Sequence, residues 1–180
     1  MNPDIPLYER DPQAWQEHLA EGNAKQPRKR VGADALIRDE RGRLLLVDPK
    51  YKPDWDIPGG MAEANEPPLD AVLRELREEL GLTLAADRMT LRCLDWVSPH
   101  GVWDDSLMFI FDAGILTEDQ IDDLRLADQE LSAFEFVTPE QAQERLRPYV
   151  WSRLSAAMEV SDDGGVVYLH DGVPAYGIQY

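Results

Sequence analysis

The sequence predicts an α/β protein in which a mixed β-sheet is sandwiched between helices. β-favouring runs and helical runs are interspersed along the 180 residues, without the strict alternation that gives a doubly wound parallel sheet. The composition, with 43% apolar and 29% charged residues, is that of a globular chain. The length suits one ordinary domain with some additional material.

The chain begins with a predicted helix and a polar linker. Asp11 is a favourable N-cap and Pro12 the predicted first residue of a helix that runs through residue 21, and Gly22 is the predicted end of that helix. Residues 26–30 contain a proline and a basic cluster, which favours a linker. The main body is therefore expected to begin near residue 31.

The first strands are predicted from a hairpin pattern. Two β-favouring runs, residues 31–38 and 43–47, flank the turn-forming residues 39–42. Five prolines and glycines then interrupt residues 48–60. We interpret that segment as a loop around a short extended stretch at residues 55–57.

Residues 67–80 carry the clearest helical pattern of the chain. Apolar residues recur at steps of three and four and form one stripe. Two prolines suit the first turn of this helix, and Gly81 suits the position just after its end. The stripe consists of Leu69, Val72, Leu73, Leu76 and Leu80.

The rest of the chain alternates between predicted strands and helices. The predicted strands are residues 91–97, 106–113 and 131–137, the predicted helices are residues 117–125, 139–146 and 148–160, and residues 166–176 form a predicted hairpin around Asp171 and Gly172. We therefore divide the chain into an N-terminal helical extension and linker (1–30), a main domain (31–146) and a C-terminal extension of helix and hairpin (147–180).

The charge balance argues against several classes of partner. The chain has 35 Asp and Glu against 18 Lys and Arg, a net charge of −17, which opposes attraction to nucleic acid or anionic membranes. Its longest apolar runs, such as residues 107–111, fall far short of the roughly 20 residues that span a bilayer. The N-terminus lacks the pattern of a signal peptide, and Cys93 is the single cysteine. We expect a cytoplasmic protein that binds neither nucleic acid nor membrane.

Three glutamates on the 67–80 helix form a candidate metal site. Glu75, Glu78 and Glu79 are spaced so that they project from one face. At about 6 Å and an effective dielectric of about 20, each pair repels by roughly 3 kcal/mol before screening. A hard divalent cation would relieve this repulsion, although a solvated acidic face fits the same spacing. The preceding glycines, Gly59 and Gly60, allow backbone groups to approach that face.

Between Gly60 and Leu82 the sequence resembles a known family. The pattern Gly60, five residues, Glu66, seven residues, then the run from Arg74 to Leu82 is similar to the Nudix box, G-x5-E-x7-R-E-U-x-E-E-x-G-U with U apolar, at every defined position. The flanking segments extend this resemblance to MutT-like Nudix hydrolases over about residues 31–146. It implies a Nudix-type α/β/α sandwich for the main domain.

The resemblance also implies an activity and roles for the residues of the box. Members hydrolyse a diphosphate linkage by attack of water with Mg²⁺ or Mn²⁺. The matching positions imply that Glu75, Glu78 and Glu79 are metal ligands, together with the Gly60 carbonyl. Arg74 is expected to hold the catalytic helix in place by pairing with a box glutamate, and Glu66 is expected to support the loop or the outer shell of a metal ion.

The general base and the pocket residues are less determined by the resemblance. We favour Glu79 or Glu75 as base, with a carboxylate outside the box as the rival. Glu135 lies where some relatives carry an added metal-binding glutamate, so it is included among the metal ligands. The other external candidates are Glu130, Asp104 and Asp105. Trp55, Trp96 and Trp103 are candidates for stacking on a base, or for ordinary packing.

The substrate implied by the resemblance is a small nucleotide-like diphosphate. We favour a nucleoside diphosphate joined to a second moiety, of the ADP-ribose type. The alternatives are a nucleoside triphosphate pyrophosphatase, including one that removes oxidised nucleotides, and a non-catalytic nucleotide-binding module. A homodimer is possible because many members of the family dimerise.

Overall fold

The computed structural model describes residues 5–127, 129–161 and 164–175. Its centre is one sheet with the strand order β6-β2-β1-β5-β4-β7-β8, and β3 pairs with β1 beside this path. The strands are β1 (Arg30–Arg38), β2 (Leu44–Pro49), β3 (Gly59–Met61), β4 (Thr90–Val97), β5 (Ser106–Ile115), β6 (Leu131–Val137), β7 (Val167–His170) and β8 (Val173–Pro174). The β1–β5 and β4–β7 pairs are parallel and the other pairs are antiparallel. The predicted mixed sheet is confirmed.

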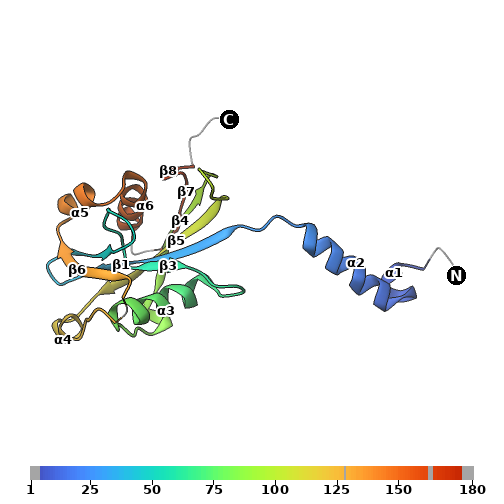
Figure 1. The fold of residues 1–180 in the computed structure, drawn as a ribbon, viewed down its shortest axis with the longest axis horizontal. Coiled ribbons are helices and arrows are strands. Elements are labelled where there is room, and N and C mark those ends of the chain that lie inside the picture. The colour runs from blue at the N-terminus through green and yellow to red at the C-terminus, as the bar shows by residue number, and fades with distance from the viewer. Residues whose placement is uncertain (1–4, 128, 162–163, 176–180) are drawn as a thin grey trace.

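Helices cover both faces of this sheet (Figure 1). One face packs on α3 (Pro68–Leu80), and the other packs on α5 (Pro139–Arg145) and α6 (Pro148–Glu159). The alternation of β1 separates the two cores, because Ala33 and Ala35 pack with α3 whereas Leu36 packs with α6. The predicted α/β/α sandwich is therefore confirmed.

The N-terminal helices project away from the sheet (Figure 1). They are α1 (Leu7–Arg10) and α2 (Pro12–Lys25), and neither has a buried residue. The prediction that Gly22 ends the helix is wrong, because α2 continues to Lys25. Solvent surrounds Gly22 and nothing lies within 4 Å of an added Cβ, so this glycine costs only about 1 kcal/mol. The helix ends where Pro27 restricts the residue before it.

Two further boundaries differ from the sequence prediction. The glycine pair, Gly59 and Gly60, belongs to β3 rather than to a loop, and pairs with residues of β1. The helix predicted over residues 117–125 is shorter, since α4 is Glu118–Asp122. It ends early because the N–H groups of Arg125 and Ala127 donate to carbonyls at the end of α3.

The C-terminal elements join the same sheet. β7 pairs with β4, and β7 and β8 form the predicted hairpin, although Tyr176, its predicted last residue, lies outside the described residues. A short 3₁₀ turn, η1 (Ala86–Arg88), precedes β4. No helix within the described ranges is both long and apolar enough to cross a bilayer.

Candidate active site at the glutamate helix

The helix α3 places the acidic residues of the box beside the glycine pair. Its apolar stripe is buried against β1, and Gly81 ends the helix in the left-handed conformation with φ 65°. This packing fixes the rotation of the helix about its axis. Glu79 is therefore buried at 7% exposure, whereas Glu78 remains exposed at the rim.

Arg74 connects the three parts of the box. Its guanidinium donates through Nε and Nη2 to the two carboxylate oxygens of Glu66, at 2.9 and 3.0 Å. Nη1 donates to Glu75 at 2.9 Å and to Glu78 at 3.0 Å, and Nη2 also donates to the Met61 carbonyl at 3.2 Å. These bonds from Arg74 lower the pKa of Glu66 to about 2. Arg74 thus ties the loop, the strand β3 and the helix together.

The glycine pair lies directly against two box glutamates. A Cβ on Gly60 would fall 2.5 Å from Oε1 of Glu75, which no real contact allows. The Gly59 N–H donates to Oε2 of Glu79 at 3.3 Å. Gly59 itself has φ +142°, and its Cβ would meet the Ala33 carbonyl oxygen at 2.4 Å. Only glycine fits at position 59, whereas a side chain at position 60 would displace the Glu75 carboxylate.

The carboxylates of the box fit a divalent cation by their chemistry. Mg²⁺ binds oxygen ligands and tolerates only a few carboxylates together with water and phosphate, and the space beside Gly60 is left open by its missing side chain. In the described part of the chain, no group of three or more His, Cys, Asp or Glu is already gathered around one point. Arg74 bonds to both Glu75 and Glu78 and offsets their charge in this structure.

Burial also shifts the pKa of one of these glutamates, Glu75. Burial raises the pKa of Glu75, and the nearby carboxylates of Glu78 and Glu130 act in the same direction, against Arg74. A carboxyl group with a raised pKa gains most from a cation that stabilises its charged form.

The carboxylates outside the box lie in different places. Glu135 on β6 faces the α5 side of the sheet and pairs with Arg145 at 2.5 Å, so the structure does not bring it to the box glutamates. Glu130, by contrast, is close enough to raise the pKa of Glu75. Asp105 is engaged by Lys29 and by the Trp96 indole N–H, and Asp104 is exposed.

The three tryptophans have different environments. Trp55 packs against the apolar cluster on the α6 side and carries the Arg145 guanidinium 5.1 Å from its ring. Trp96 stacks edge-on with His170. Trp103 lines a cavity that begins at the glycine pair, so it is the tryptophan positioned to meet a ligand.

The cavity at the glycine pair contains residues that the sequence pattern did not single out. We call it the α6-side pocket; its volume is about 340 Å³, and its polar lining includes Asp34, Lys52 and Arg153. Burial raises the pKa of Asp34 to about 8, with Asp56 acting in the same direction and Arg153 opposing it. Two of these charges interrupt an apolar run, Asp34 in β1 and Arg153 in α6, and that interruption was the available signal in the sequence.

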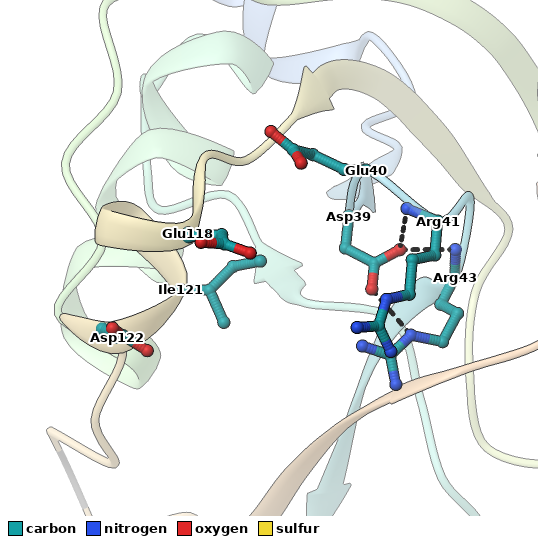
Figure 2. Close-up of a pocket in the computed structure, with 7 residues that line it drawn as sticks. All are labelled: Asp39, Glu40, Arg41, Arg43, Glu118, Ile121 and Asp122. Carbon is teal, nitrogen blue, oxygen red and sulfur yellow. Dashed lines mark hydrogen bonds and ion pairs between the residues drawn. The ribbon is translucent and has the colours of Figure 1, made fainter.

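A second cleft, of about 410 Å³, lies between the β1–β2 turn and α4 (Figure 2). Asp39 in this cleft accepts hydrogen bonds from the N–H groups of Arg41 and Arg43 and from Nε of Arg43, at 3.0, 2.8 and 2.6 Å. These bonds stabilise the turn and satisfy the carboxylate. None of the predicted site residues lines this cleft.

The fold and the box define a class of diphosphate-cleaving hydrolases, and comparison with known proteins agrees. Residues 28–156 match the NUDIX domain. The chain belongs to the Nudix family, whose hydrolases act on diphosphate linkages.

Several relatives share this domain. A MutT-like protein of Streptomyces ambofaciens is 27% identical over 146 residues, covering 81% of this chain and 86% of that protein. An RNA pyrophosphohydrolase of Halorhodospira halophila is 39% identical over 69 residues, but the match covers only 35% of this chain and 38% of that protein. The crystal structure of a MutT NUDIX hydrolase from Burkholderia pseudomallei superposes with a TM-score of 0.57 at 26% identity, covering 75% of this chain and 100% of the other.

Proposed function

We propose that this chain hydrolyses a nucleoside diphosphate joined to a second moiety, of the ADP-ribose type, with Mg²⁺ or Mn²⁺. The observation that carries this proposal is the contact of the glycine pair with Glu75 and Glu79. This contact brings backbone groups, which can approach a diphosphate closely, to the carboxylates that suit a divalent cation.

The shape around β3 supports a substrate with a group at each end of its diphosphate. The α6-side pocket and a broader cleft of about 810 Å³, lined by residues 27–31 and 61–66, both reach Met61. Arg30 lines both. A nucleoside triphosphate has a bulky group at only one end, so it would leave one of these spaces unused.

The Gly60 carbonyl and the three box glutamates, Glu75, Glu78 and Glu79, would hold the divalent cation. When bound, such a cation neutralises charge on the phosphoryl oxygens and makes water a better nucleophile at neutral pH. Arg74 keeps Glu75 and Glu78 on the same side of the helix. Glu66 holds Arg74 in turn through two parallel bonds.

We assign Glu79 as the group that accepts the proton of the attacking water. Its carboxylate is buried and is fixed beside the glycine pair by the Gly59 N–H. Glu75 is the weaker candidate because Arg74 already donates to one of its carboxylate oxygens. Glu135 is not assigned a role, since its partner is Arg145 on the opposite face.

The proposal is tested by supplying a mixed substrate pool to the purified full chain, with Mg²⁺ or with EDTA, and following it by mass spectrometry. The pool contains ADP-ribose, nucleotide sugars, dinucleoside polyphosphates, normal and oxidised nucleoside triphosphates, and a 5′-triphosphate RNA. Metal-dependent loss of a nucleoside diphosphate derivative is the expected result. Loss of triphosphates alone would support the pyrophosphatase alternative, and binding without any cleavage would support a non-catalytic module.

A further inference from the structure

The α6-side pocket is unusually basic for this chain. Its lining contains four cationic side chains, Arg30, Lys52, Arg147 and Arg153, against two carboxylates, Asp34 and Asp56. The chain as a whole has nearly twice as many acidic as basic residues, 35 against 18. The excess of cations is therefore local, and it faces the space into which a substrate would extend from the glycine pair.

Among the described residues, three of these cations are paired with carboxylates and one, Arg30, is not. Lys52 pairs with Asp56, and Arg147 donates to Asp54 at 2.6 Å. Arg30 lies 4.5 Å above the Trp103 ring, and no described carboxylate forms an ion pair with it. Arg153, the fourth cation, is paired with the buried Asp95.

Arg153 is buried but incompletely satisfied. It is 4% exposed, and its guanidinium lies 5.5 Å from the centre of the Tyr149 ring. Its Nε is 3.3 Å from Oδ2 of the fully buried Asp95, yet neither atom has a hydrogen-bond partner among the described residues. A guanidinium carries five N–H donors, and a buried donor without an acceptor is costly.

Arg153 also stands where two cavities meet. A neighbouring cavity of about 260 Å³ is lined by Arg153, Tyr149, His100 and Val97, which line the α6-side pocket as well. The side chain is therefore accessible from the glycine pair through the pocket. An anionic group of a bound substrate is able to reach it without opening the core.

We propose that Arg153 binds a phosphate monoester that the substrate carries in addition to its scissile diphosphate. Arginine presents a planar fork that matches phosphate with two parallel hydrogen bonds, and a phosphate monoester brings close to two negative charges at neutral pH. A dianion supplies more negative charge than a carboxylate to a pocket whose lining has four cations and two carboxylates. The substrate class is then a nucleoside diphosphate derivative with a further phosphate on one of its sugars, and this inference rests on the proposed function.

The test compares two substrates that differ only in this phosphate, ADP-ribose and 2′-phospho-ADP-ribose. KM is measured with Mg²⁺. Kd is measured by calorimetry in EDTA, where the metal needed for hydrolysis is removed. We expect KM and Kd to be roughly 10-fold or more lower for the phosphorylated compound, the effect of a hydrogen-bonded charge. Equal values for the two compounds in the unmodified protein would overturn the inference, whatever happens to any variant.

Variants then locate the effect. Arg153→Lys keeps the positive charge but loses the fork, so the ratio of the two KM values should fall towards one, and Arg153→Gln should remove the preference. Arg41→Gln, in the cleft between the β1–β2 turn and α4, is the matched control and should keep both the rate and the ratio. A preference that survives in folded Arg153→Gln protein would contradict the assignment to Arg153.

The two proposals fail in different ways. If both compounds are cleaved with equal KM and bound with equal Kd, the proposed function stands and the phosphate site does not exist. If neither is cleaved with Mg²⁺ but the phosphorylated compound binds more tightly in EDTA, the phosphate site stands and the proposed hydrolysis is wrong. If Arg153→Gln does not fold, the Kd ratio of the unmodified protein decides alone.

Discussion

The two sides of the glycine pair are built in opposite ways. On the α3 side, the charged residues Glu75, Glu78 and Glu79 come from one helix within five positions of the chain. On the α6 side, the charges come from separate elements, such as Asp34 of β1 and Arg153 of α6. The first side is acidic and suits cations, whereas the second has an excess of bases and suits an anion.

This difference assigns catalysis to the α3 side and substrate recognition to the α6 side. A helix guarantees that residues at i, i+3 and i+4 share a face, so the acidic side keeps its geometry as long as α3 remains packed. The basic side depends on the relative positions of β1, β5 and α6. Residues on one of these elements can be substituted without changing the other two. We therefore expect changes at the α3 side to affect kcat and changes at the α6 side to affect KM.

The largest effect is expected from Glu79→Gln. Glutamine keeps the size of the side chain but accepts a proton poorly, so kcat should fall roughly 100- to 10,000-fold, the range for losing a proton-transferring group. The thermal unfolding midpoint should change little. Glu144→Gln, an exposed position on α5, is the control. Turnover close to normal in folded Glu79→Gln protein would contradict the assignment of catalysis to the box.

Asp34→Asn tests the electrostatics of the α6 side through the pH dependence of stability. Burial raises the pKa of Asp34 to about 8, so between pH 4 and pH 8 the unfolded chain has lost this proton while the folded chain still holds it. The free energy of unfolding is reduced as the pH rises through that window.

The asparagine variant lacks this penalty. Its advantage over the unmodified chain should grow by roughly 1 kcal/mol per pH unit between pH 4 and pH 8, and then stop growing. Urea unfolding at several pH values measures this difference in the free energy of unfolding, with the exposed Asp122→Asn as control. A difference that is independent of pH would mean that Asp34 is ionised in the folded protein throughout.

Gly60→Ala tests whether the close approach of Gly60 to the Glu75 carboxylate is needed for activity. The new Cβ would fall 2.5 Å from Oε1 of Glu75, so the carboxylate must move, and kcat should fall by up to roughly 100-fold. Gly22→Ala is the matched control, since nothing lies within 4 Å of its Cβ. Unchanged kcat in Gly60→Ala would show that the position of Glu75 is not critical.

The smallest effect is expected from Arg74→Lys. Lysine keeps the charge but lacks the fork that bonds both oxygens of Glu66, so the free energy of unfolding should fall by roughly 1–2 kcal/mol. Arg77→Lys, exposed on the same helix, should cost much less. Equal losses in the two variants would show that the bonds of Arg74 within the box add nothing to stability.

Local patterns predicted most of the secondary structure. The stripe of α3, the hairpin of β1 and β2 and the helix that begins at Pro139 all appear as expected. The failures occur where tertiary contacts override a local rule. The helix α4 ends early because N–H groups after it bond to the end of α3, and the glycine pair becomes a strand because β1 offers it an edge.

By itself the sequence determined the box, because helical periodicity alone places Glu75, Glu78 and Glu79 on one face. It also indicated the family, since the pattern from Gly60 to Leu82 is contained in one continuous segment. Only the tertiary structure decided that Glu135 pairs with Arg145 and that Arg153 lines the same pocket as the glycine pair. The physical reason is that the face to which a distant side chain points depends on strand register and helix packing. A shift of one residue in strand register turns that side chain to the opposite face of the sheet.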